Sequence, residues 1–105
     1  MGVVSPMADH FASGTWHVNE GSEEAFVQRW TELLEWTRGE FPGLVEGTLI
    51  HDRNDPGHYI SVAAWADAES RDAWKQSGEF KQRMGACVAL CDRMVGSDYD
   101  LAASV

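Results

Sequence analysis

The segment YISVAAW, residues 59–65, constrains the possible folds of this chain more than any other. Its β-branched and aromatic residues favour a β-strand. Side chains along a strand point alternately to opposite faces, and here both faces are apolar: Tyr59, Ala63 and Trp65 on one, Ile60, Val62 and Ala64 on the other. A strand of a small antiparallel sheet normally keeps one polar face in water. Both faces of this strand must therefore be covered, and helices of the same chain can cover only one of them.

Length, composition and charge predict a small globular protein without a nucleic-acid partner. The chain has 105 residues, of which 44% are hydrophobic and 24% charged, values typical of one folded domain. Its formal net charge of −9 disfavours nucleic acids and anionic membranes as partners, because both require clustered Lys and Arg. No apolar run approaches the roughly 18 residues of a membrane-spanning helix, and the N-terminus lacks the basic start of a signal peptide. We therefore expect a cytoplasmic protein with a flexible tail at 1–10 and one domain at 11–105.

Cys87 and Cys91 are the two cysteines of the chain. Their spacing would place both on one face of a helix, which suits either half of a metal or redox site or two small buried side chains. A structural zinc site needs four ligands, and the sequence has no second cysteine pair. We therefore predict buried thiols in a reducing compartment and no metal site.

The rest of the sequence predicts alternating strands and helices. Strands are expected at 13–18, 44–51, 58–65 and 99–104, and helices at 23–38, 68–76 and from about 79 onward. The first helix is indicated by apolar residues at helical spacing, namely Phe26, Trp30, Leu33, Leu34 and Thr37. Ser22 and Asp67 are expected to cap the first two helices. The loop DRNDPG, 52–57, is rich in turn-forming residues and predicts a hairpin between the second and third strands.

This order of elements, β-α-β-β-α-α-β, predicts an α+β protein with the ferredoxin-like, split βαβ fold. Such a fold has a four-stranded antiparallel sheet with its helices on one face. The face that carries Ile60, Val62 and Ala64 then remains bare. The same face of a second copy is the simplest cover, so we predict a homodimer in which two sheets meet.

Three blocks of the sequence resemble the antibiotic biosynthesis monooxygenase family of the dimeric α+β barrel superfamily. They are GTWHVNEGSEEAFVQRW (14–30), FPGLVEGTLIHDRNDPGHYISVAAW (41–65), and AW followed by SGEF (73–80). The resemblance covers residues 13–103. It implies protomers whose sheets pack face to face in a dimer, each with a small-molecule pocket between its helices and its sheet. Because this fold hosts several chemistries, the site residues have to decide the activity.

One branch of this family oxidises aromatic polyketides to quinones with O₂ and without metal or flavin. The tryptophan that ends its third strand is matched by Trp65, whereas Ser61 and Arg71 stand where the branch has Asn and Tyr. The protein's part in such a reaction is to bind a flat phenol, shift its pKa and exclude water. The resemblance therefore implies a cofactor-independent monooxygenase that acts on a small aromatic or phenolic, polyketide-like substrate.

Three residues are candidates for catalysis on this interpretation. Trp65 could stack on an aromatic ligand and donate a hydrogen bond, Arg71 could hold a phenolate, and His17 could act as a base near neutral pH. The candidate substrate-binding residues are Tyr59, Ser61, Trp74, Met84 and Trp16. Each of these side chains could instead fill the core or lie on the surface, as most aromatic and charged residues of small domains do.

A second branch of the family degrades haem, and its pattern is only partly present. That branch has an Asn on the first strand, a Trp on the helix after the third strand, and an iron-ligating His later in the chain. Trp74 matches the Trp, but Gly14 and Met84 occupy the other two positions. We therefore expect no cofactor, and haem binding or haem degradation stays one alternative function. The other alternative is a non-catalytic dimer that binds a small hydrophobic ligand.

Overall fold

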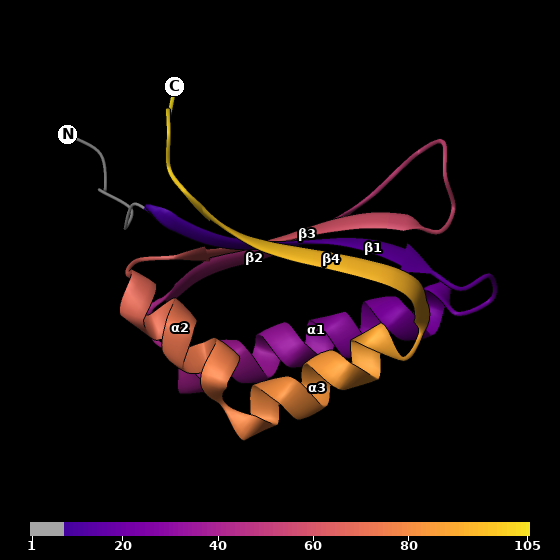
Figure 1. Ribbon diagram of the computed structural model, residues 1–105, viewed down its shortest axis with the longest axis horizontal. Coiled ribbons are helices and arrows are strands. Elements are labelled where there is room, and N and C mark those ends of the chain that lie inside the picture. The colour runs from indigo at the N-terminus through magenta and orange to yellow at the C-terminus, as the bar shows by residue number, and fades with distance from the viewer. Residues whose placement is uncertain (1–7) are drawn as a thin grey trace.

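A four-stranded antiparallel sheet carries three helices on one face in the computed structural model, which describes residues 8–105. The strands are β1 (His10–Val18), β2 (Leu44–His51), β3 (His58–Trp65) and β4 (Cys91–Asp100), and the helices are α1 (Glu23–Glu40), α2 (Ala68–Gln76) and α3 (Gly78–Val88). The strand order is β2-β3-β1-β4, and Figure 1 shows the helices gathered beneath the sheet. This is the ferredoxin-like α+β fold that the sequence predicts.

The register of the sheet decides which residues face the helices. In the pairing of β1 with β3, Trp16 lies opposite Tyr59 and Gly14 opposite Ser61. Gly14 also lies opposite Gly96 of β4. The side chains at these positions and at alternate positions along each strand form the inner face of the sheet, which the helices cover.

The outer face of the sheet is open to solvent in the single chain. Ile60 lies between Thr15 and Ile50 in the register of the three strands that carry them. Ile50 and Val95 are 56% and 57% exposed, while Ile60 is half-buried. The apolar residues on the two faces of β3 thus have different surroundings: helices cover the inner face, and the outer face, with Ile50 and Val95, is exposed.

Helix starts follow the predicted capping pattern at one of two positions. The Asp67 carboxylate accepts a hydrogen bond from the Ser70 backbone N–H at 2.7 Å, which caps α2 as predicted. Ser22 precedes α1, but its side chain makes no capping bond. The Glu23 carboxylate instead accepts from the Gly21 N–H at 2.8 Å, so an acidic side chain in the first turn satisfies the backbone there.

Several predicted boundaries are wrong. The first strand begins at His10 rather than at 13, the first helix ends at Glu40 rather than at 38, and the last strand ends at Asp100 rather than at 104. The last strand begins at Cys91 rather than at 99, and α3 ends at Val88, so Cys87 and Cys91 do not share a helix. The segment 96–98 is Gly-Ser-Asp, which has a weak strand preference. Pairing with β1 along β4 overrides that preference.

The predicted N-terminal tail, 1–10, overlaps the first strand at His10. Its residues 1–7 lie outside the described residues. In the part of the chain that the structure describes, none of the helices is long and apolar enough to cross a membrane.

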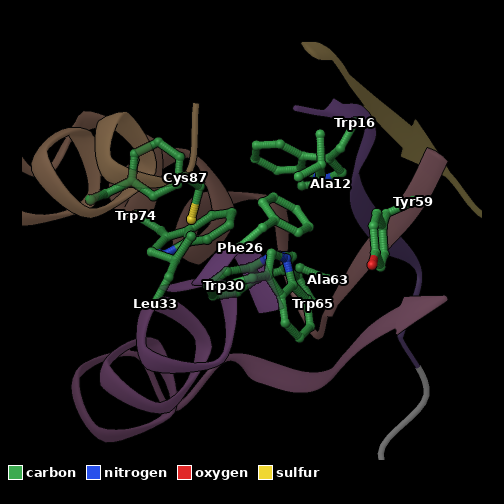
Figure 2. Close-up of a cluster of buried hydrophobic side chains, with 12 residues drawn as sticks. Ala12, Trp16, Phe26, Trp30, Leu33, Tyr59, Ala63, Trp65, Trp74 and Cys87 are labelled. Atoms are coloured by element: carbon green, nitrogen blue, oxygen red, sulfur yellow. The ribbon is translucent and has the colours of Figure 1, made fainter. Parts of the chain in front are cut away.

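Aromatic rings link the sheet to the helices in the core (Figure 2). Trp16 on β1 packs against Phe26 on α1 with ring centroids 5.0 Å apart. Trp65 at the end of β3 packs against Trp74 on α2 at 5.1 Å, and Trp74 in turn contacts Phe80 on α3 edge-on at 4.4 Å. Rings of this size supply most of the apolar burial that holds a small domain together, and they also form the walls of the site.

Candidate functional site

A small hollow of about 60 Å³ lies between the inner face of the sheet and the helices, and we call it the cavity. Strands β1, β3 and β4 and all three described helices contribute to its walls. Its lining includes Trp16, Ser61, Trp74, Lys75, Met84 and Met94. A mostly apolar wall with few polar groups is typical of a site for a small organic molecule.

The polar centre of the cavity is a bonded pair of side chains from two neighbouring strands. The indole Nε1 of Trp16 donates to the hydroxyl oxygen of Ser61 at 2.9 Å, and the two residues are 1% and 8% exposed. Gly14 makes room for this bond, since a Cβ there would lie 2.8 Å from Nε1 and 3.0 Å from the hydroxyl oxygen. Because the Ser61 oxygen accepts this bond, its own hydrogen is available to donate to a molecule in the cavity.

The cavity has one fixed aromatic wall on the helix side and two adaptable side chains, Met84 on α3 and Met94 on β4. The Trp74 Nε1 donates to the Thr37 hydroxyl at 2.8 Å, and that hydroxyl donates to the Leu33 carbonyl at 2.7 Å. These bonds fix the orientation of the indole. Met84 and Met94 also line the cavity, and methionine side chains change rotamer at low cost to fit a guest.

Trp65 lies one layer behind this wall. Its side chain is fully buried between Phe41 and Trp74, with ring centroids 6.3 Å and 5.1 Å away, and it does not line the cavity. Its indole Nε1 is the one buried side-chain polar atom of the described residues that lacks a hydrogen-bond partner. An unpaired buried donor costs stability, so the native core tolerates a small energetic defect at this position.

Arg71 lies away from the cavity lining. Its guanidinium donates to the Phe11 carbonyl at 3.5 Å and to the Asp72 carboxylate at 3.3 Å. Its side chain is 11% exposed. Arg71 therefore ties α2 to β1, and no part of it lines the cavity.

His17 lies on the outer face of the sheet, so the prediction that it serves the inner pocket is corrected. It follows Trp16 directly on β1, and adjacent strand residues point to opposite faces. Its ring stacks on that of His58, with centroids 5.1 Å apart, and its Nε2 accepts from the Arg93 guanidinium at 3.1 Å. His58 in turn contacts Asp52 at 2.9 Å, and this bond holds the pKa of the Asp52 carboxyl below its usual value.

Tyr59 borders a second, more open hollow between α1 and the end of β2. This groove measures about 390 Å³ and also includes Thr31 and His51. The His51 ring stacks on the Tyr59 ring at 4.2 Å. Burial, and the nearby negative charge of Glu23, raise the pKa of the Tyr59 hydroxyl, which therefore stays a neutral donor at physiological pH.

The structure thus brings together Trp16, Ser61, Trp74 and Met84 of the predicted site residues. It adds Lys75, which sequence reasoning missed. A lysine in the last turn of an amphipathic helix is ordinary in sequence, because it favours the helix dipole. Lys75 belongs to the site only because α2 brings it close to β4, and the spacing of residues along the chain does not predict that approach.

A metal ion or haem does not fit the residues present. No cluster of three or more His, Cys, Asp or Glu side chains occurs among residues 8–105. Burial raises the pKa of the Cys87 thiol to about 11, so it stays protonated and is a poor ligand. Gly14 and Met84, which stand where the haem-degrading pattern has Asn and His, both line the cavity, and there is no space for a side chain at Gly14.

An aromatic cavity roofed by helices over a ferredoxin-like sheet is typical of an α+β protein that binds a small organic molecule. Within that class, the chain belongs to the antibiotic biosynthesis monooxygenase family, whose model matches residues 10–85. A comparison with curated proteins finds no significant match.

Solved structures share the fold at low sequence identity. A point variant of SnoaB, described as a cofactor-independent oxygenase from Streptomyces nogalater, superposes with a TM-score of 0.85 at 17% identity, covering 94% of this chain and 98% of that one. A conserved protein from Methanosarcina mazei gives 0.79 at 18% identity, with coverages of 91% and 95%. An antibiotic biosynthesis monooxygenase gives 0.73 at 21% identity, with coverages of 91% and 99%. At these identities the likeness establishes the fold alone.

Proposed function

We propose that this protein is a cofactor-independent monooxygenase that oxidises a small phenolic substrate of the polyketide type. The observation that carries the proposal is the Ser61 hydroxyl, which Trp16 orients from one side inside an otherwise apolar cavity. Membership of the monooxygenase family supports the reaction class. The fold shared with an oxygenase described as cofactor-independent supports the absence of metal and flavin.

The chemistry requires the substrate to supply the electrons. A phenol that loses its proton becomes an electron-rich phenolate, which can reduce O₂ without a redox cofactor. For a methylene group held between aromatic rings, one oxygen atom replaces two hydrogens as a carbonyl and the other leaves as water, so CH₂ and O₂ give C=O and H₂O. The protein holds the ring against Trp74, donates a hydrogen bond from Ser61 to the developing negative oxygen, and excludes water.

Substrate binding must enlarge the cavity. About 60 Å³ is well below the roughly 300 Å³ of the smallest common ligand sites. Trp30 and Leu34 line both the cavity and a neighbouring groove of about 370 Å³ between α1 and β2. The Leu34 side chain fills the space above Gly47, where a Cβ would lie 2.7 Å from its Cδ1. Movement of Leu34 would join the two spaces and give room for a bicyclic or tricyclic phenol.

The proposal places Trp65 in support of the site rather than at the reacting centre. Trp65 fixes Trp74 from behind, and neither Arg71 nor His17 lines the cavity. A test can therefore compare Ser61, which touches the guest, with Trp65, which does not.

Oxygen uptake with a panel of hydroxyanthrones in metal-free buffer is the direct test. We expect the wild-type protein to consume one O₂ per substrate and to form the quinone. Ser61→Ala removes a donor at the developing charge, and losing one such donor costs about 10²-fold in turnover. Trp65→Phe should keep its turnover within about threefold, because it removes an unpaired N–H that does not reach the cavity.

A wild-type protein that consumes none of the panel would contradict the oxygenase proposal. A folded Trp65→Phe protein whose turnover falls more than about tenfold would indicate that Trp65 acts at the reacting centre. Circular dichroism should accompany each assay, because Ser61→Ala also leaves the Trp16 N–H without its acceptor, at a cost of about 1–3 kcal/mol.

A non-catalytic ligand-binding protein is the second candidate, and one observation favours it. Among the described residues that line the cavity, none is an Asp, Glu or His that could act as a general base. Tight binding of a phenol without oxygen uptake would select this candidate. A Soret shift on haem titration would instead indicate haem binding.

We further propose that two copies associate through their outer sheet faces in the cytoplasm. Ile50, Ile60 and Val95 lie in one row across the outer face of the sheet, with Thr15 between Ile60 and Val95, and Ile50 and Val95 are exposed. The free thiols of Cys87 and Cys91 suit a reducing compartment.

Sedimentation velocity tests this association. Wild-type protein at micromolar concentration should sediment as a dimer, and Ile60→Asp should raise the dimer dissociation constant at least about 100-fold by burying an unpaired charge. Val88→Asp, at an exposed apolar position on α3, is the matched control and should stay dimeric. A wild-type monomer at these concentrations would overturn the proposal.

A further inference from the structure

Lys75 is the one charged residue among the described side chains that line the cavity. It lies in the last turn of α2, directly after Trp74. The remaining wall is mainly aromatic and aliphatic, so the low local polarity strengthens the effect of any charge at its border.

The ammonium group of Lys75 is held at the rim of the cavity by an ion pair with Asp98 of β4. The two side chains are 35% and 39% exposed. Asp98 lies opposite Ala12 in the sheet register, and Ala12 also lines the cavity. The ion pair therefore joins α2 to an edge strand where the interior meets solvent.

We propose that Lys75 binds the ionised oxygen of a phenolic guest and that Asp98 holds Lys75 in place while the cavity is empty. The inference rests on the proposed function only in taking the guest to be a phenol. On binding, the phenol O–H bond breaks, the electron pair stays on oxygen, and the proton passes to water at the rim. Lys75 then exchanges the carboxylate of Asp98 for the phenolate, while Ser61 donates its free hydrogen to the same guest.

A cation in this position favours the charged form of the guest. An opposite charge within about 4–6 Å lowers the pKa of an acid by about 1–3 units. The other basic groups at this end of the sheet, Arg71 and His10, do not line the cavity. Arg71 pairs with Asp72 at 3.3 Å, and His10 pairs with Asp100 at 3.0 Å, which Arg71 also approaches at 4.0 Å. Lys75 is therefore the cation that a guest in the cavity meets.

Binding of 4-nitrophenol measures this effect without any turnover, because the phenolate absorbs visible light and the neutral phenol does not. We expect the bound probe to ionise about 1 pH unit below the free probe. Lys75→Met should abolish this shift and weaken phenolate binding about tenfold, while leaving the affinity for uncharged 4-nitroanisole unchanged. Lys75→Arg should restore the shift. Asp98→Asn should enlarge it, because the probe no longer competes with a carboxylate.

Lys81→Met is the matched control, since Lys81 is exposed on α3 and does not line the cavity; it should behave as the wild type. The inference is overturned if 4-nitrophenol does not bind or if the bound probe ionises at the same pH as the free one. It is also overturned if Lys75→Met loses affinity for 4-nitrophenol and 4-nitroanisole equally. A normal shift in a protein that never consumes O₂ would support Lys75 as the phenolate ligand and contradict only the oxygenase proposal.

Discussion

A Trp74→Ala protein is expected to lose about 3–5 kcal/mol of unfolding free energy, the usual cost of truncating a large buried aromatic side chain. Trp74 is 4% exposed and contacts Trp65 and Phe80. Its removal opens a void where the sheet meets α2 and α3. Because small domains are stable by only about 5–15 kcal/mol, the variant should be marginally folded at room temperature. Urea unfolding at low temperature, followed by circular dichroism, measures the loss.

Trp36→Ala provides the comparison for this experiment. Trp36 is half-buried, meets Phe41 edge-on at 5.7 Å and lies under the Arg83 guanidinium at 5.7 Å. It lies outside the cavity lining, so its truncation should cost less than half as much. If the two variants lose the same unfolding free energy, Trp74 contributes no more to stability than Trp36 does.

A Gly14→Ala protein is expected to lose ligand binding at least about tenfold and about 1–3 kcal/mol of stability, because its added methyl group overfills the core. The new Cβ would lie within 2.8 Å of the Trp16 Nε1 and 3.1 Å of the Met94 Cε, so the Trp16–Ser61 bond must break or lengthen. Backbone strain does not contribute, since Gly14 does not have a positive φ. Titration with 4-nitrophenol and urea unfolding measure the two effects.

Gly39→Ala is the matched glycine substitution. Gly39 lies near the end of α1, and a Cβ there would meet nothing within 4 Å. Alanine in a helix is favoured over glycine by about 0.5–1 kcal/mol, so this variant should bind normally and gain stability. If Gly14→Ala behaves like Gly39→Ala, the space at Gly14 is not what keeps the cavity open.

Periodicity predicted the central part of the fold because local pattern and tertiary position agree there. The hairpin of 44–51 and 58–65 and the helix 68–76 match β2, β3 and α2 at both ends, since turn residues and the Asp67 cap fix them locally. The last strand was placed too late because β4 is specified by its partner β1. The pairing of β4 with β1 is a long-range contact, which the local pattern of a single sequence does not predict.

The sequence predicted which face of the sheet carries the site, but not where along the strands the cavity lies. Alternation along β3 correctly grouped Ser61 with Trp65 on one face, and the same rule places His17 opposite to Trp16. Alternation does not tell how far along the strand the cavity lies, so Trp65 was expected to line a space that in fact ends one layer before it. Lys75 joins the site through the approach of α2 to β4, which is a purely tertiary feature.

The size of the cavity has a consequence for the order of events in an oxygenase. A buried water molecule typically needs two to four polar partners, and this hollow offers little besides one serine hydroxyl and a lysine at its rim. Apolar voids stay dry and take up nonpolar gases, and most of the lining of this cavity is apolar. Under the proposed function, dissolved dioxygen would therefore partition into the resting interior ahead of any larger molecule, and the oxidant would be in place before the phenol binds.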